Sequence, residues 1–417
     1  MYTVFKFGGA SIRDVDSIKN VGHILNSYSN KKLVIVFSAM GKITNMLEGV
    51  VEDYFQKNNN LIYSLKKIKD FHYNILSDLF HDKHCIYNEV NNLFVEIEWV
   101  LETDPIESYA YIYDQIVSIG ELLSSKIMNT YLNEIGFQNS LFDARDLIKT
   151  DNTYRNARLD WNETVNSIKS LIKEGQCITQ GFIGCTSENF TTTLGREGSD
   201  FTAAVLAYAL EAKEVVIWKD VPGMMNADPK YFNGPKLLEE ISFDEAIELA
   251  YFGAKVIHPK TIKPLKKKKI PLFIKSFLNP KESGTQISED VEHNYKIPSF
   301  IIKENQILIS ISDRTLSFIV ETHMSKIFTL LAKHAISVNM MQNSAVSFSI
   351  CVDYDKYKIP QLIGDLKNDF EVYYNTNLSL YTVRHYEEDS ANDFLKGKVI
   401  LLEQRSRNTL QLVVMDI

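Results

Sequence analysis

Four short segments of the chain combine glycine with lysine, arginine or aspartate at the end of an apolar run. The first is Lys6-Phe7-Gly8-Gly9-Ala10-Ser11, which ends an extended segment at the start of the chain. A strand that runs into two glycines and then into a helix can direct bare backbone N–H groups at an anion, and Lys6 adds a positive charge there. A tight structural turn would use the same residues. By itself, this segment therefore indicates only an anion near the end of a strand.

The second segment is Thr193-Leu194-Gly195-Arg196-Glu197-Gly198-Ser199-Asp200, which precedes an apolar stretch with helical spacing. Polar groups at the N-terminus of a helix can form an anion site, because the backbone N–H groups and the positive end of the helix dipole lie there. Ser199 or Asp200 could instead be the N-cap of the helix. Both interpretations place Arg196 and Asp200 at the start of this helix.

The third and fourth segments lie further along the chain. Trp218-Lys219-Asp220-Val221-Pro222-Gly223 directly follows an apolar strand, and Phe252-Gly253-Ala254-Lys255-Val256 contains a lysine that is either a phosphate contact or a surface residue. Ligands of open α/β sheets bind beyond the carboxyl ends of the strands, so these turns converge only if their strands are neighbours. The chain contains neither a Walker A pattern nor Gly-x-Gly-x-x-Gly, which argues against the nucleotide folds that use them.

Alternating strands and helices must position these turns. The run 33–37 is entirely apolar, as in a strand that is buried on both faces of a parallel sheet. We expect strands at residues 4–7, 33–37, 140–142, 177–184, 215–218 and 270–274, and helices at 15–27, 161–174, 200–211 and 261–269. This order predicts an α/β fold in which helices cover both faces of a mostly parallel sheet.

Other regions of the chain interrupt or follow this alternation. Residues 42–135 carry apolar residues at helical spacing and predict a helical insertion within a catalytic domain that spans 1–285. Charged residues and Pro298 mark 286–299 as a linker. Residues 300–385 predict a separate α+β module, and residues 386–417 predict a strand hairpin.

The bulk composition predicts a soluble protein without a nucleic-acid or membrane partner. Apolar residues make up 45% of the chain, and the net charge is −8. No apolar run approaches the roughly 18 residues of a membrane span. The four scattered cysteines and the lack of a signal-peptide pattern predict a cytoplasmic location. Residues 81–85 hold two histidines and a cysteine, but we expect a solvated helix end rather than metal ligands.

Together and in this order, the segments resemble the aspartate kinase branch of the amino acid kinase family. The matching motifs are Lys6-Phe7-Gly8-Gly9-Ala10-Ser11, Ser38-Ala39, Ser118-Ile119-Gly120-Glu121, Thr179-Gln180-Gly181-Phe182, Gly195-Arg196 with Gly198-Ser199-Asp200, Asp220-Val221-Pro222-Gly223 and Gly253-Ala254-Lys255-Val256. The resemblance covers essentially the whole chain and implies a three-layer αβα sandwich followed by an ACT-like module. It also implies MgATP-dependent phosphorylation of L-aspartate to 4-phospho-L-aspartate, the first step of lysine, threonine and methionine biosynthesis.

For the phosphate side, the resemblance implies that Lys6 and Asp200 are catalytic. The implied nucleotide-binding residues are Lys6, Gly8, Gly9, Ser11, Lys219, Asp220, Met225, Lys230, Lys255 and Val256. Mg²⁺ would be held largely by phosphate oxygens. An aspartate side chain, with a pKa of about 3.9, is already ionised at neutral pH, so the chemistry needs cations rather than a general base.

For the amino-acid side, the resemblance implies that Arg196 binds the α-carboxylate and Glu121 the α-ammonium. A guanidinium can bind a carboxylate through two parallel hydrogen bonds. A solvated helix residue is the alternative interpretation of Glu121. The implied pocket is completed by Ser38, Thr44, Phe182 and Ser199.

This chain departs from the family pattern at several positions. Ala10 replaces a threonine, Glu197 stands where glycine is common, and Met225 and Lys230 stand where many members have tyrosine and arginine. The ACT-like module implies a homodimer or higher homo-oligomer and an amino-acid effector, lysine or threonine. The implied effector residues are Met324, Ser325, Asn339, Gln342, Asn343 and Ser344. Residues 386–417 correspond to a truncated second ACT-like unit.

Two other functions use similar features. Another amino acid kinase would act on glutamate, N-acetylglutamate or a nucleoside monophosphate, but the pair of Arg196 and Glu121 and the ACT-like region argue against it. A catalytically silent amino-acid sensor would keep the fold, but Lys6 and Asp200 argue against that alternative.

Overall fold

The computed structural model describes residues 1–254, 256–289, 291, 297–314, 318–387 and 397–416. Lys255, one of the predicted site residues, lies outside them. The chain divides into two compact units. The first comprises Met1–Met224, Leu237–Ile247 and Val256–His293, and the second comprises Met225–Lys236, Glu248–Lys255 and Asn294–Ile417.

An eight-stranded sheet forms the centre of the first unit, in the order β3-β4-β2-β1-β7-β9-β10-β8. Its strands are β1 (Thr3–Phe7), β2 (Leu33–Phe37), β3 (Ser140–Phe142), β4 (Cys177–Gln180), β7 (Glu214–Lys219), β8 (Glu240–Ser242), β9 (Leu272–Ser276) and β10 (Thr285–Ser288). Every neighbouring pair is parallel except β9 and β10. The predicted α/β fold with a mostly parallel sheet is confirmed. The predicted linker 286–299 needs one correction, because β10 pairs with β9 and places residues 286–288 in this sheet.

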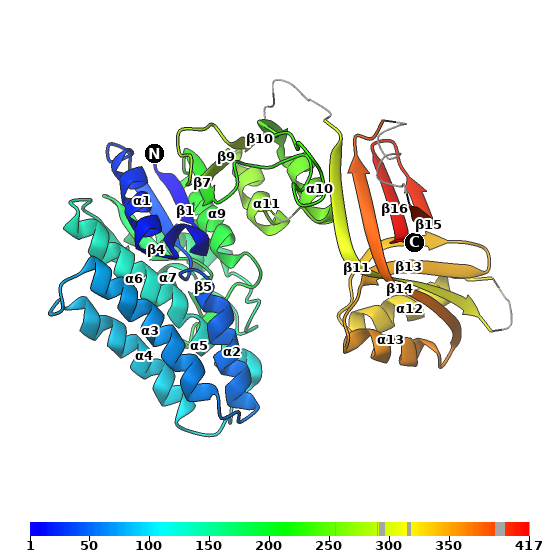
Figure 1. The fold of residues 1–417 in the computed structure, drawn as a ribbon, viewed down its shortest axis with the longest axis horizontal. Coiled ribbons are helices and arrows are strands. Elements are labelled where there is room, and N and C mark those ends of the chain that lie inside the picture. Colours follow the sequence, from blue (N-terminus) through cyan, green and yellow to red (C-terminus); the bar gives the residue numbers. More distant parts are fainter. Residues whose placement is uncertain (255, 290, 292–296, 315–317, 388–396, 417) are drawn as a thin grey trace. The chain divides into compact units, whose positions relative to one another are not determined.

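Helices cover the sheet and extend from it. They are η1 (Gly9–Ile12), α1 (Val15–Asn26), α2 (Ile43–Phe55), α3 (Leu61–Leu79), α4 (Ile86–Leu101), α5 (Tyr109–Val117), α6 (Ile119–Glu134), α7 (Ala144–Leu147), α8 (Trp161–Leu171), α9 (Gly198–Leu210), α10 (Phe243–Phe252) and α11 (Pro259–Lys268). Helix α9 packs on β1, β2 and β7, with α8 and α11 beside it, and α6 packs on β2, β3 and β4. Figure 1 shows α2 to α6 gathered as a helical block within this unit.

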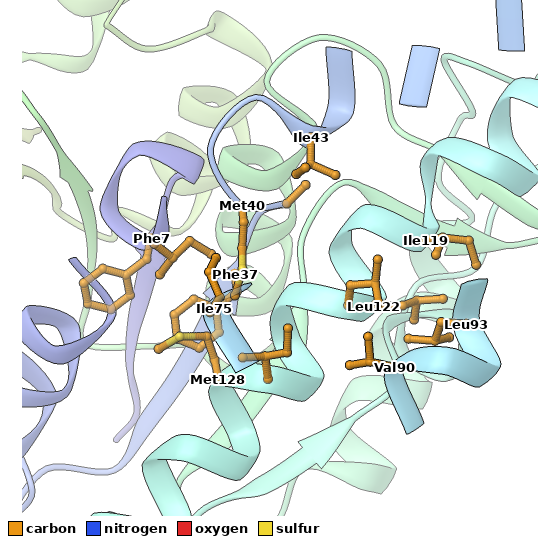
Figure 2. Packing of buried hydrophobic residues seen from close by; sticks show 14 of the residues in the cluster. Phe7, Phe37, Met40, Ile43, Ile75, Val90, Leu93, Ile119, Leu122 and Met128 are labelled. Atoms are coloured by element: carbon orange, nitrogen blue, oxygen red, sulfur yellow. The ribbon is translucent and has the colours of Figure 1, made fainter. Parts of the chain in front are cut away.

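The strands of the sheet bury large side chains on the face toward the helical block. Phe7 and Phe37 stack with ring centroids 5.7 Å apart, and Trp218 stacks on Phe7 at 5.9 Å. These residues form one apolar core with side chains of α3, α4 and α6, including Ile75 and Met128 (Figure 2). Because side chains alternate along a strand, Lys6 lies on the face opposite Phe5 and Phe7.

Two expected elements are interrupted. The predicted strand 177–184 breaks into β4 and β5 (Ile183–Cys185), because Phe182 between them has a φ of 70°. A small antiparallel sheet then joins β5 to β6 (Thr191–Thr193). Within the insertion, the apolar residues from Tyr109 to Ile135 have helical spacing and predict one long helix, but this helix ends at Val117 and restarts at Ile119.

The second unit contains a six-stranded antiparallel sheet in the order β12-β13-β11-β14-β16-β15. Its strands are β11 (Ser299–Asp313), β12 (Val338–Asn343), β13 (Ser347–Asp353), β14 (Phe370–Arg384), β15 (Lys398–Arg405) and β16 (Thr409–Asp416). Helices α12 (Glu321–Lys333) and α13 (Lys358–Leu366) share an apolar core with β11, β13 and β14. The strands of the C-terminal hairpin, β15 and β16, continue this sheet from β14 (Figure 1).

Candidate active site

Two lysines and one aspartate meet where β1 and β7 end and α9 begins. Lys6 Nζ lies 2.6 Å from Asp200 Oδ1, and Lys219 Nζ lies 3.2 Å from Asp200 Oδ2. Lys6 and Lys219 reach the same carboxylate because β1 and β7 are adjacent parallel strands and both side chains lie on the face that α9 covers. Asp200 stands in the first turn of α9, where the helix dipole favours an anion.

The Asp200 carboxylate is ionised and almost completely buried, with 2% of the residue exposed. Burial by itself would raise the pKa of this group, but the charges of Lys6 and Lys219 outweigh burial and lower the pKa below its ordinary value. The three groups together carry one net positive charge. This charge is available to an anion at the strand ends.

The turn after β1 is shaped by close contacts. A Cβ on Gly9 would lie 2.6 Å from the carbonyl oxygen of Gly41, so only glycine fits there. A Cβ on Gly8 would lie 3.3 Å from Lys6 Nζ, so a side chain there would cover the ammonium group. Ser11 is fully buried, and its hydroxyl donates to the Gly8 carbonyl oxygen at 2.6 Å. Its hydroxyl therefore fixes the shape of the turn.

A cavity of about 530 Å³ opens beside these charges. Nine of the predicted site residues line it: Lys6, Ser38, Thr44, Glu121, Phe182, Arg196, Ser199, Asp200 and Lys219. Residues that are far apart in the sequence thus line one cavity. They include residues assigned to the phosphates and residues assigned to the amino acid. Its volume suits a small polar molecule next to a phosphoryl group.

Glu121 reaches this cavity from the first turn of α6. The residue is 2% exposed, and its Oε1 accepts a hydrogen bond from the backbone N–H of Ala39 at 3.3 Å. Within the described part of the chain, no group bonds to its buried Oε2. Burial raises the pKa of Glu121 to about 8, although the Ala39 N–H and the Lys6 charge act in the opposite direction. A cationic ligand would restore the ionised form.

Arg196 and Glu197 form the turn that enters α9. Arg196 is exposed and lines the cavity, and no bond from a described residue holds its guanidinium. Glu197 has a φ of 53°, the left-handed region that favours glycine, which accounts physically for the usual glycine at this position. Burial also raises the pKa of the Glu197 carboxyl, against the nearby charge of Lys219. Glu197, which stands where glycine is common in the family, thus adds a partly buried carboxyl group with a strained backbone to the cavity wall.

The other predicted nucleotide residues that the structure describes do not line this cavity. Lys219 Nζ donates a hydrogen bond to the Val256 carbonyl oxygen, which ties the end of β7 to the segment before α11. Asp220 is exposed directly after β7. Met225 and Lys230 belong to the second unit, where Lys230 Nζ bonds to the Tyr231 hydroxyl at 2.7 Å.

Sequence reasoning missed four side chains that line the cavity, namely Asn45, Glu48, Tyr113 and Arg155. Glu48 follows the predicted residue Thr44 by four positions on the same helix, so its i+4 spacing was an available signal, whereas the i+1 spacing of Asn45 was not. Tyr113 lies in an aromatic stretch that reads equally well as helix packing. Arg155 stands in a loop with no recognisable motif.

The predicted effector residues lie in the second unit, on α12, on β12 and in the turn after β12. The Asn339 amide is already committed, because its Nδ2 donates to Gln306 Oε1 at 2.8 Å and its Oδ1 accepts from Lys303 Nζ at 2.9 Å. Gln342 and Asn343 are exposed.

Within the described part of the chain, no helix is long and apolar enough to cross a membrane.

Comparisons with known proteins identify relatives over most of the chain. The model of the amino acid kinase family matches residues 1–276. Lysine-sensitive aspartokinase 3 of Escherichia coli is 34% identical over 354 residues, which cover 84% of this chain and 78% of that protein. The chloroplastic aspartokinase 1 of Arabidopsis thaliana is 31% identical over 414 residues, which cover 95% of this chain and 69% of that protein.

Solved structures agree with the sequence comparisons. The crystal structure of E. coli aspartokinase III in complex with aspartate and ADP matches with a TM-score of 0.86 at 29% identity, covering 99% of this chain and 96% of that chain. The structure of the same enzyme in complex with lysine and aspartate matches with a TM-score of 0.82 at 30% identity, covering 99% and 95%.

Proposed function

Because this chain belongs to the amino acid kinase family and, within it, to the aspartokinases, we propose that it transfers the γ-phosphoryl group of ATP to the side-chain carboxylate of L-aspartate. The products are ADP and 4-phospho-L-aspartate. One observation carries the proposal: Lys6 and Lys219 share the buried Asp200 at the head of a cavity that also contains Arg196 and Glu121. The resemblance seen in the sequence is confirmed.

We assign the phosphates to the strand ends. The ammonium groups of Lys6 and Lys219 and the backbone N–H groups of Gly8 and Gly9 would hold them, in the turn that Ser11 fixes. Asp220, Met225, Lys230, Lys255 and Val256 remain the proposed contacts of the nucleotide. The Asp200 carboxylate is committed to two lysines, so Mg²⁺ would be held mainly through phosphate oxygens and would neutralise part of their charge.

We assign the amino acid to the other half of the cavity. Arg196 would bind the α-carboxylate, and the buried Glu121 oxygen would accept from the α-ammonium. Ser38, Thr44, Phe182 and Ser199 line the space between them. This arrangement leaves the side-chain carboxylate of the substrate to face the phosphate-binding lysines.

The reaction then needs charge neutralisation more than proton transfer. The β-carboxylate is ionised at neutral pH and attacks the γ-phosphorus while the bond to the β-phosphate oxygen breaks, and that oxygen leaves with ADP. Lys6 and Lys219 are fixed by Asp200 before the reaction begins, so little reorganisation is required when negative charge spreads over the transferred group.

The regulatory assignments extend the same proposal. We propose an amino-acid effector, lysine or threonine, near Met324, Ser325, Asn339, Gln342, Asn343 and Ser344. We also propose a homodimer or higher homo-oligomer that forms through the ACT-like region, a cytoplasmic location, and a domain division into 1–288, 300–385 and 386–417, in which the first domain ends with β10. The lysine-sensitive relative and the lysine-bound neighbour support the first of these proposals.

The decisive assay measures ADP formation by the purified protein with MgATP and each of L-aspartate, L-glutamate and N-acetyl-L-glutamate. The proposal predicts turnover with aspartate alone, and hydroxylamine should trap the acyl phosphate as the hydroxamate. Turnover with glutamate, or none with any of the three, would contradict the assignment.

A further inference from the structure

We propose that Arg155 is a specificity-determining residue of the amino-acid pocket, which binds the substrate α-carboxylate together with Arg196 after releasing Glu48. The inference rests on the proposed function, because it concerns the same cavity. Arg155, Glu48 and Arg196 all line that cavity.

The backbone of Arg155 is held in place by a buried carboxylate. Its φ is 66°, and its N–H donates to both carboxylate oxygens of Asp114 at 3.0 and 3.1 Å. Asp114 is fully buried and also accepts hydrogen bonds from the N–H and the hydroxyl of Thr193 at 2.8 and 2.6 Å. One carboxylate therefore ties the Arg155 loop to β6, the strand that leads into Arg196.

The two arginine-bearing loops are in direct contact. A Cβ on Gly195, the residue before Arg196, would lie 3.2 Å from the Arg155 carbonyl oxygen. The side chains of Arg155 and Arg196 therefore extend from neighbouring backbone segments at one wall of the cavity. Two such groups can share one carboxylate.

The Arg155 guanidinium is oriented by the rings of Tyr109 and Tyr113 and by one ion pair. It lies over the ring of Tyr113, 4.4 Å from the centroid, and its Nη2 is 3.2 Å from Glu48 Oε1. Tyr113 is buried, whereas the side chains of Arg155 and Glu48 are 45% and 36% exposed. The contact with Tyr113 holds the guanidinium at the cavity wall, and the single bond to Glu48 leaves N–H groups for a second carboxylate.

Because the Arg155–Glu48 ion pair is partly exposed, another carboxylate can replace Glu48 at little cost in free energy. A half-exposed ion pair contributes little to stability, so a carboxylate that enters the cavity can replace Glu48. Without substrate, Glu48 neutralises Arg155. With substrate, the α-carboxylate would take its place, and this exchange favours substrates that carry a charged α-carboxylate.

Steady-state kinetics of Arg155→Ala and Glu48→Gln separate this role from a structural one. We expect Arg155→Ala to raise KM for aspartate roughly tenfold, while kcat and KM for ATP stay within about twofold of the wild-type values. Glu48→Gln removes the competitor of the substrate and should lower KM for aspartate. A pair with only a structural role predicts that both variants raise KM. Arg158→Ala, which removes an exposed arginine of the same loop, is the matched control.

A substrate analogue gives a second, independent readout. In the α-amide of L-aspartate a neutral amide replaces the α-carboxylate, while the β-carboxylate remains. The proposed partner of Arg155 is then absent, so Arg155→Ala should change kcat/KM for this analogue by less than about twofold. Arg155→Lys keeps the charge but loses the planar fork, and we expect an intermediate KM for aspartate. If Arg155→Ala does not fold, the KM values for aspartate of Glu48→Gln and Arg155→Lys test the proposal instead.

The outcomes distinguish this inference from the proposed function. Absence of aspartate-dependent turnover in the wild-type protein would overturn the proposed function. Wild-type turnover with an unchanged KM in Arg155→Ala, a raised KM in Glu48→Gln, or an equal Arg155→Ala effect on aspartate and its α-amide would overturn only the role of Arg155.

Discussion

The ammonium groups of Lys6 and Lys219 depend on Asp200 for their position, and Asp200 depends on them for its charge. A buried carboxylate without a partner would be protonated or would destabilise the fold. Two lysines on adjacent strands would repel each other without the shared anion. The three charges therefore act as one unit, and the loss of any one changes the other two.

We expect Lys6→Met and Asp200→Asn each to lower kcat by at least about a hundredfold, because prepositioned charges at the transferred phosphoryl group are lost. A coupled ADP assay at saturating aspartate measures this effect, and thermal unfolding checks the fold. Lys19→Met, which changes an exposed lysine of α1, is the control. Full activity in either variant would remove Lys6 and Asp200 from the catalytic site.

The buried Glu121 predicts a pH dependence for substrate binding. Its pKa is raised to about 8, so in the free enzyme the carboxyl is mostly protonated below that pH and only the ionised form attracts an ammonium group. We expect kcat/KM for aspartate to rise roughly tenfold per pH unit up to about pH 8. Glu121→Gln should lower kcat/KM and flatten this rise, whereas Glu134→Gln on the same helix should leave it unchanged. A profile that is flat from pH 6 to pH 8 in the wild-type protein would contradict the assignment.

Helix α3 carries a histidine into the core of the helical block. His72 is fully buried, its Nδ1 donates to the Ile68 carbonyl oxygen at 2.8 Å, and no described group bonds to its Nε2. The rings of Phe71 and Phe94 lie 5.2 and 5.7 Å away. Burial lowers the pKa of His72 from 6.5 to about 4, so the folded protein holds it neutral.

This histidine predicts a loss of stability in acid. Below pH 6.5 the unfolded chain binds a proton at His72 that the folded chain does not bind, so the free energy of unfolding falls as the pH decreases from 6.5 to about 4. At about pH 5 the loss from this residue is roughly 2 kcal/mol. Urea unfolding at pH 7 and pH 5 measures it. His72→Leu should lose less stability between these values than the wild type or the exposed-site control His23→Leu, and equal losses in all three would contradict the prediction.

The whole chain combines a kinase unit with an ACT-like unit, and one of its relatives, aspartokinase 3 of E. coli, is lysine-sensitive. We expect lysine rather than threonine to inhibit ADP formation, because a lysine-sensitive relative and a lysine-bound structure match this chain. Gln342→Ala should raise the lysine concentration that gives half-inhibition without changing kcat, since Gln342 is exposed on β12 and the Asn339 amide is already bonded. Gln361→Ala on α13 is the control. Equal inhibition of all three proteins would place the effector elsewhere.

Much of the catalytic unit follows from local patterns in the sequence. The apolar run 33–37 and the turn 6–11 identify β2 and the end of β1, because burial on both faces and a glycine turn leave local signals. Alternation along β1 predicts the face on which Lys6 lies, but Lys6 meets Asp200 only because α9 packs on that face of the sheet. The family resemblance then supplied the amino-acid half of the site, and its residues line the same cavity.

Other features depended on contacts between distant parts of the chain. The break at Phe182 requires a left-handed φ, which no local pattern in the sequence indicated. Residues 285–288 form β10 because they pair with the edge of β9. Arg155 and Glu48 are 107 residues apart, and they meet because the Arg155 loop is bonded to α5 and α5 packs on α2, the helix that carries Glu48. Sequence periodicity reports which face of an element is buried, whereas the meeting of two loops depends on how those elements pack. The sequence therefore identified the residues of the phosphate-binding centre, and the tertiary structure decided where they meet and which charges line the rest of the pocket.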